Sequence, residues 1–421
     1  SGTFNLDTST INYHTAGGAN FIPSTSANFD TNTSTLNLIG LNGSNRAHNF
    51  TFASGNMHNI TTSRGAGTDT HTDTLNGNCT ITGDLTVGAN SNFSTGSRVF
   101  TVNGDVDVTG QLISNGSDKP MTFGSLTINS GGTYLATSGT TTIKGNASSS
   151  SNLALNIDSN ATFTHNSGTI LFDGTNTFGG SSYGHFYFGD KTFNNITINA
   201  SGKFIQPRKS STTTLDINGD LTITAGQLSN YNNDIIWDIA GDVDVSGTLG
   251  ITDSTGAYSF GSLTINSGGT YNATSGTTTI TDETSGGYGL INSGTYTHNN
   301  GKLKIDFNTP NKDAHTIIQV NDLYDLEIDM NASNYEVKFD DTSGNATNIL
   351  NNLDITQGVF ESKDNGDTLT IHGLTRITSN GTFMPDANHD TNKIIHNGLV
   401  TNSGTYKIND GTTVKMNGGI R

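Results

Sequence analysis

The stretch Phe123-Gly124-Ser125-Leu126-Thr127-Ile128-Asn129-Ser130-Gly131-Gly132-Thr133-Tyr134 occurs a second time, without one change, at residues 260–271. Such a perfect recurrence indicates an internal repeat, and a repeat decides the fold before any local pattern does. Within the stretch, Leu126 and Ile128 flank a threonine, and this alternation predicts a short strand with one face turned inward. A polar turn with two glycines follows, and Tyr134 closes the pattern.

The duplication extends over a whole long unit of the chain. The offset that relates residues 123–134 to 260–271 also relates residues 104–108 to 241–245, and nearly the same offset relates residues 83–85 to 219–221. A more diverged third copy carries Asn352-Leu353-Asp354-Ile355 where the second has Asp220-Leu221-Thr222-Ile223. The sequence therefore predicts three units of one continuous solenoid, at residues 1–146, 147–284 and 285–421.

Equivalent inward positions recur at short steps inside each unit. The apolar residue Ile223 is followed by Val245, and Val245 is followed by Ile265, at nearly equal spacing. A step of about 20–25 residues suits one rung of a parallel β-helix, in which each rung stacks on the one before it. The sequence thus predicts an all-β parallel β-helix, or β-solenoid, of about eighteen rungs.

Three consecutive β-sandwich domains are the competing architecture. They would need hairpins, and Asn-Gly is the strongest short hairpin signal. It occurs at Asn42-Gly43, Asn115-Gly116 and Asn380-Gly381. We favour the solenoid because matched strands recur within each unit as well as between units.

The composition indicates a thin core and limits the partners. Hydrophobic residues make up 31% of the chain, against roughly 45–50% in ordinary globular domains. The formal net charge of −17 would repel a nucleic-acid backbone or an anionic membrane surface, so we expect no nucleic-acid partner. No apolar run approaches the roughly 20 residues of a membrane-spanning helix, so no membrane insertion is expected.

Two sequence patterns carry a family resemblance. They are Leu-Thr-Ile-Asn-Ser-Gly-Gly-Thr-Tyr, at residues 126–134 and 263–271, and the Gly-Asp strands at residues 104–108 and 219–223. The chain resembles, over nearly its whole length, the β-strand repeat proteins of microbial surfaces, including the haemagglutinin-like and autotransporter-passenger right-handed β-helices. This compositional resemblance implies an extracellular or cell-surface β-helix used for adhesion, coating or filament formation.

The Gly-Asp turns supply the candidate metal ligands. The separation of Asp84 from Asp105, and that of Asp220 from Asp242, each equal one rung, so each pair could stack on adjacent rungs. A carboxylate ladder of this kind suits Ca²⁺, which prefers several oxygen ligands. Gly-Asp is also a common turn pair, and the third unit has Asn352 and Leu374 at the matching positions. Calcium is the one candidate cofactor, and no other cofactor is expected.

Other candidate residues favour structural roles. His165 and His298 share the context Thr-His-Asn, and we interpret them as exposed turn residues rather than a metal site. Cys79 aligns with Leu215 of the next unit and is expected to pack as a small apolar side chain. The recurring aromatic residues are expected to stack inside the rungs rather than form an exposed sugar-binding platform; they are Phe4, Tyr134, Phe163, Tyr271, Tyr296, Phe383 and Tyr406.

The sequence favours a structural function over a catalytic one. Phe4 and Tyr406 mark nearly the same phase of the repeat, and open solenoid ends recruit further strands. We therefore expect a structural module of a surface layer, sheath, stalk or filament that assembles head to tail with itself or with further repeats. An adhesin that binds glycans or another cell is the alternative. A polysaccharide-cleaving β-helix enzyme is less favoured, because no acid–base cluster with catalytic spacing appears.

Overall fold

The computed structural model describes the chain except for a set of short segments. The segments left out are residues 1–3, 6–7, 16–19, 22–28, 31–32, 41–45, 51–56, 65–69, 115, 210–213, 231–233, 252–253, 308–315, 321, 340–346, 363–367, 386–392 and 409. In the remainder, 60% of the residues lie in strands and there is no helix. Accordingly, the described residues include no helix that could cross a membrane.

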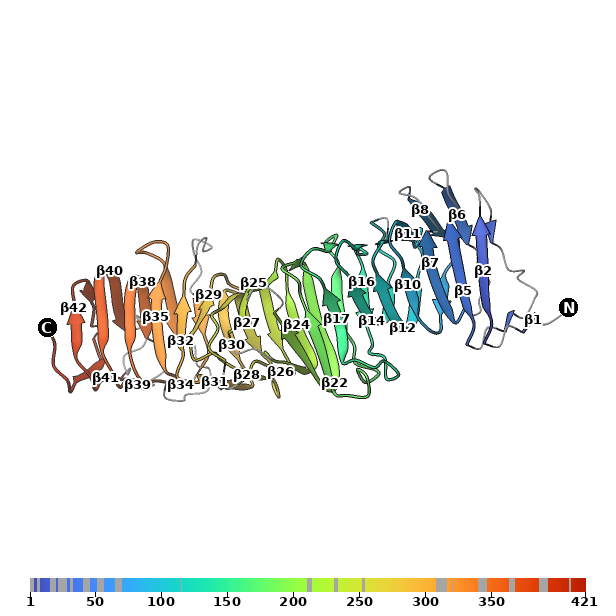
Figure 1. The fold of residues 1–421 in the computed structure, drawn as a ribbon. Coiled ribbons are helices and arrows are strands. Elements are labelled where there is room, and N and C mark those ends of the chain that lie inside the picture. Colours follow the sequence, from blue (N-terminus) through green and yellow to red (C-terminus); the bar gives the residue numbers. More distant parts are fainter. Residues whose placement is uncertain are drawn as a thin grey trace. The chain divides into compact units, whose positions relative to one another are not determined.

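The strands form a parallel β-solenoid of about 14 turns. Strands of successive turns lie side by side, as β2, β5 and β7 show in Figure 1. This confirms the predicted fold class. The predicted neighbours are also correct, because Ile223 pairs with Val245 and Val245 pairs with Ile265. The prediction of about eighteen rungs was too high, because some turns between strands are longer. The number of residues along the chain between two paired positions varies. It is small between Val106 and Leu126 and much larger between Leu155 and Phe186.

The sandwich alternative is wrong for the described part of the chain. The strand pairs whose registers are established there are all parallel, and a hairpin would require an antiparallel pair. Asn380-Gly381 lies inside one continuous strand, β40 (Thr375–Pro385), instead of turning the chain back. Asn42-Gly43 and Asn115 lie outside the described residues.

The chain divides into two compact units. The first comprises Ser1–Leu215 with Ala225–Tyr231, and the second comprises Asp216–Thr224 with Asn232–Arg421. This division follows packing rather than sequence similarity, so the three sequence repeats stay a prediction.

In the first unit, three stacks of parallel strands form the sides of each turn. The first stack contains β2 (Thr10–Thr15), β5 (Thr35–Gly40), β7 (Asn59–Arg64), β10 (Leu85–Val87), β17 (Leu153–Ile157) and β20 (Tyr183–Tyr187). The second contains β9 (Cys79–Ile81), β16 (Thr140–Ile143) and β19 (Thr169–Phe172). The long strands β12 (Phe100–Val108), β14 (Met121–Ile128) and β22 (Asn195–Arg208) bend across both stacks. The third contains β3 (Asn20–Phe21), β6 (Arg46–Phe50), β8 (His71–Leu75), β11 (Ser91–Ser94), β13 (Gln111–Ile113), β15 (Thr133–Leu135) and β18 (Thr162–Thr164). Shorter strands are β1 (Phe4–Asn5), β4 (Phe29–Asp30) and β21 (Thr192–Phe193), whereas β23 (Thr214–Ile217) and the following strand, β24 (Leu221–Leu228), have residues in both units.

The second unit also has three sides. Its first two stacks contain β24 (Leu221–Leu228), β25 (Ile236–Val245), β27 (Tyr258–Ile265), β29 (Thr277–Ile280), β30 (Tyr288–Asn292), β32 (Lys302–Ile305), β33 (Thr316–Ile318), β35 (Asp325–Asp329), β36 (Glu336–Phe339), β38 (Leu353–Ser362), β40, β42 (Val400–Asn402) and β43 (Thr405–Tyr406). The remaining side is formed by β26 (Thr248–Leu249), β28 (Thr270–Asn272) and β31 (Thr295–Thr297), and by β34 (Asp322–Leu323), β37 (Thr347–Ile349), β39 (Thr368–Ile371), β41 (Lys393–His396) and β44 (Thr413–Met416).

The core is a set of columns that run from turn to turn. Because side chains alternate across a strand, paired residues in successive strands point the same way. One such column contains Leu36, Ile60, Leu85, Val106 and Leu126, and each is at most 1% exposed. Full burial of a side chain of this size stabilises the fold by about 1.5–3 kcal/mol, so a core one turn wide can hold a chain with few apolar residues.

The predicted aromatic residues form a ladder of the same kind, although Phe163, Tyr296 and Tyr406 are half-buried rather than fully enclosed. Tyr134 and Tyr271 are fully buried. The ring of Tyr134 lies 6.1 Å from that of Phe163, and the rings of Tyr271 and Tyr296 are 5.6 Å apart. Phe383 and Tyr406 stack at 4.9 Å. The side chain of Phe4 lies outside the described residues.

Glycine forms a column at the corner between the first two stacks. A Cβ atom on Gly104 would lie 2.6 Å from the carbonyl oxygen of Gly83, and one on Gly124 would lie 2.4 Å from that of Gly104. No side chain fits such a gap without a shift of the backbone. The turns can therefore approach closely here only because each contributes a glycine.

Candidate functional site: the aspartate ladder and a polar groove

The four predicted metal ligands lie at this glycine corner. In the first unit, a carboxylate oxygen of Asp84 accepts a hydrogen bond of 2.8 Å from the backbone N–H of Asp105. The carboxylate of Asp105 in turn accepts hydrogen bonds from the hydroxyl of Ser125 at 2.6 Å and the side-chain amide of Asn146 at 3.0 Å. Each aspartate thus links its own turn to the next one.

The second unit has the same arrangement. Asp220 accepts a hydrogen bond of 3.0 Å from the backbone N–H of Asp242, and Asp242 accepts one of 2.7 Å from the hydroxyl of Ser262. The structure therefore places each predicted pair on adjacent turns, as its spacing in the sequence indicated.

The same contact is made where asparagine replaces aspartate, which the Gly-Asp spacing did not predict. The side-chain oxygen of Asn59 accepts the backbone N–H of Asp84 at 2.8 Å, which extends the ladder by one turn. A second ladder in the second unit lies at a different corner of the turns, where β35, β38 and β40 begin. There Asp325 accepts the N–H of Asn352, and the amide oxygen of Asn352 accepts the N–H of Leu374 at 2.9 Å. Asparagine makes this contact without a charge, so the feature that these contacts share is an acceptor oxygen rather than a carboxylate.

This geometry supports a role for the ladder in joining turns. Among the described residues, no group of three or more His, Cys, Asp or Glu side chains is arranged to hold a metal ion. Calcium binding at Asp84, Asp105, Asp220 and Asp242 stays a prediction, because hydrogen bonding to a backbone N–H leaves other carboxylate oxygens able to contact an ion.

His165 and His298 occupy matching tight turns. The Nδ1 atom of His165 accepts the backbone N–H of Ser167 at 3.0 Å, and that of His298 accepts the N–H of Asn300 at 3.0 Å. The two residues after each histidine have positive φ, and a glycine closes each turn. Both histidines are half-buried rather than fully exposed, and each stabilises its turn.

Two further ionisable side chains, those of Cys79 and His396, are buried inside the solenoid. Cys79 is 5% exposed, and burial raises the pKa of its thiol to about 12, so it packs as a small apolar side chain as expected. His396 is fully buried between the hydroxyls of Thr375 and Tyr406, at 2.8 and 2.9 Å, and burial lowers its pKa to about 4. A neutral histidine with both ring nitrogens occupied contributes to core packing, away from any substrate.

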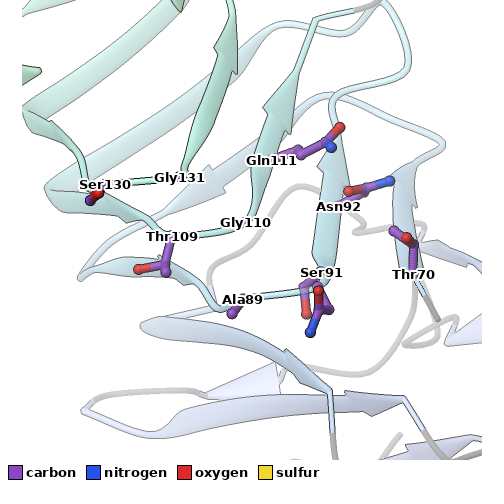
Figure 2. Close-up of a pocket in the computed structure, with 10 residues that line it drawn as sticks. Thr70, Ala89, Ser91, Asn92, Thr109, Gly110, Gln111, Ser130 and Gly131 are labelled. Carbon is purple, nitrogen blue, oxygen red and sulfur yellow. The ribbon is translucent and has the colours of Figure 1, made fainter. Parts of the chain in front are cut away.

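A polar groove of about 330 Å³ lies on the third side of the first unit. Figure 2 shows that it follows the turns that lead into β11, β13 and β15. A Cβ atom on Gly110 would lie 2.1 Å from the carbonyl oxygen of Ser91, so glycine is needed where these turns meet. The groove is lined by Thr70, Ala89, Asn90, Ser91, Asn92, Thr109, Gly110, Gln111, Ser130 and Gly131.

The chemistry of this groove is limited to hydrogen bonding. Its lining offers hydroxyl, amide and backbone groups, and none of the lining side chains titrates near neutral pH. Proton transfer by a general acid or base requires such a group within reach of the substrate. The groove can therefore hold a hydroxylated ligand or water but has no group of its own for acid–base chemistry.

No protein-family model, curated protein or solved structure matches this chain. The β-solenoid that the resemblance to microbial surface repeats implied is present. The finer assignment to the haemagglutinin-like or autotransporter-passenger class has no support from a family or a homologue and stays an expectation.

Proposed function

We propose that this chain is a non-catalytic structural module of an extracellular assembly, such as a surface layer, sheath, stalk or filament, and that it stacks end to end on further turns of the same kind. A parallel solenoid supports this proposal because each turn is a template for the next one. The further turns would come from a second copy or from more of the same protein.

The observation that carries the proposal is the last described turn. Within the described residues, β44 pairs only with β41. Val414 and Met416 occupy inward positions there and are half-buried, whereas their partners Ile394 and His396 are at most 1% exposed. Ile420, which bridges to Val400 as the start of another turn, is 56% exposed. Another stacked turn would bury all three side chains.

Light scattering after size-exclusion chromatography, together with electron microscopy, tests whether copies stack. We expect filaments in the wild type and their loss in Val414→Lys, because a lysine in the stacking core would have to be buried unpaired. Thr413→Lys is the matched control, since it adds the same charge one residue earlier on the outward, exposed side of β44. Discrete wild-type monomers at every concentration would contradict stacking between copies.

A further inference from the structure

One outward face of the first unit differs from the rest of the solenoid. On β20 and the second half of β22, Tyr183 pairs with Phe204, His185 with Gln206, and Tyr187 with Arg208. The residues between them, including Phe186 and Ile205, are fully buried. These six side chains lie on the outward face of two paired strands, and we call them the aromatic platform.

Two rings of the platform are stacked at the surface. The rings of Tyr183 and Phe204 have centroids 4.9 Å apart and planes at 20°. Tyr183 is 44% exposed and is the single aromatic residue among the large exposed apolar side chains of the described residues. The inward aromatic ladder accounts for core packing, so packing does not explain a ring that faces solvent.

Polar groups extend the platform along both strands. Arg208 Nη2 lies 2.8 Å from His185 Nε2. Because an arginine only donates, that ring nitrogen accepts, and the histidine is neutral. Burial and the nearby guanidinium both lower the pKa of His185, which keeps it neutral. Along β22, Gln206 lies between Phe204 and Arg208. Apolar ring faces and hydrogen-bond donors therefore share one surface.

The scaffold does not require these side chains. On earlier turns, the outward positions in register with Tyr187 carry short polar or acidic side chains, namely Thr86, Asp107, Thr127 and Asn156. The same face of the solenoid therefore folds on those turns without aromatic side chains. Side chains that the fold does not need are available for binding.

The local charge sets the kind of ligand. Residues 178–209 contain the basic residues Lys191, Lys203, Arg208 and Lys209 but the single acidic residue Asp190, whereas the whole chain has 36 acidic and 19 basic residues. An anionic ligand is favoured here although the rest of the molecule repels it.

We propose that the aromatic platform binds an acidic polysaccharide made of uronic-acid rings. The C–H face of one sugar ring would stack on Tyr183 and Phe204, whose apolar faces are presented together. A carboxylate further along the chain would pair with Arg208, since guanidinium groups bind carboxylates through charge-assisted hydrogen bonds. This site lies on different strands from the stacking edge and does not depend on end-to-end assembly.

Affinity electrophoresis through gels that contain polygalacturonate tests the proposal on the full chain. We expect the wild type to be retarded and Tyr183→Ala to bind about tenfold more weakly, because one stacked ring is lost. Arg208→Gln retains a donor toward His185 but removes the cation, so retardation by polygalacturonate is expected to fall to the level seen with hydroxyethylcellulose, a neutral polymer.

Tyr324→Ala is the matched control. Tyr324 is half-buried and stacks on His298 at 5.8 Å and 20° in the second unit. The variant therefore removes a stacked tyrosine ring outside the platform, and its retardation is expected to equal that of the wild type. The proposal is overturned if Tyr183→Ala binds like the wild type, if the wild type binds both polymers equally, or if oligothymidine competes better than oligogalacturonate. Binding by monomers would stand even if no filaments form, so this test and the assembly test fail separately.

Discussion

At the scale of single residues, the acceptor oxygen of the aspartate ladder matters more than its charge. Asp84 accepts the backbone N–H of Asp105, and Asn59 and Asn352 make equivalent contacts through a neutral amide. We expect Asp84→Asn to leave the free energy of unfolding nearly unchanged and Asp84→Ala to lower it by about 1 kcal/mol, because the N–H loses its partner. Urea unfolding followed by circular dichroism measures both.

The same variants test the calcium prediction. If the ladder binds calcium, millimolar Ca²⁺ will raise the unfolding midpoint of the wild type and not that of Asp84→Asn, since ligand binding stabilises only a folded state with an intact site. Equal losses in Asp84→Asn and Asp84→Ala without calcium would show that the negative charge itself is needed and would contradict the acceptor-only interpretation.

The two candidate sites differ in how far the sequence predicts them. The spacing of the Gly-Asp turns correctly placed Asp84 beside Asp105, because equal steps keep residues in one column. The aromatic platform could not be found in this way. Tyr183 and Phe204 become neighbours only through the register that follows the irregular pairing of β17 with β20, where Leu153 and Leu155 pair with consecutive residues.

At the scale of elements, the corner glycines allow long strands to bend from one stack to the next. A Cβ atom on Gly124 would lie only 2.4 Å from the carbonyl oxygen of Gly104. We expect Gly124→Ala to lower the free energy of unfolding by about 1–3 kcal/mol, because β12 and β14 must move apart. Gly131→Asn is the control. Gly131 has a φ of +78° and open space around it, and asparagine tolerates that conformation.

Urea unfolding of both variants checks this prediction. A Gly124→Ala protein as stable as the wild type would mean that the turns separate at little cost and that the glycine column is not needed for close stacking. The sequence predicted the strands beside this column well, since the steps from β10 to β12 and from β12 to β14 are nearly equal. It overestimated the number of turns because the longer step from β17 to β20 contains an extended loop, whose length no periodic pattern sets.

At the scale of the whole molecule, a solenoid has contacts only between neighbouring turns, so its stability is local. The chain contains one tryptophan, Trp237, which is fully buried in the second unit and stacks on Tyr258 at 4.5 Å. Its fluorescence therefore reports the packing of a few turns, whereas far-ultraviolet circular dichroism reports strands along the entire chain.

Comparing tryptophan fluorescence with circular dichroism therefore measures how far the loss of packing in one turn affects the unfolding of other turns. Phe123 and Phe260 occupy identical sequence contexts, both are fully buried, and they belong to the first and second units respectively. Phe→Ala in a core costs about 3–5 kcal/mol. We expect Phe260→Ala to lower the unfolding midpoint seen by tryptophan fluorescence, and Phe123→Ala to shift part of the circular dichroism transition while leaving the fluorescence midpoint in place. Coincident shifts of both signals in Phe123→Ala would mean that the chain unfolds as one cooperative body, because the loss of one ring would then reach turns that it does not contact.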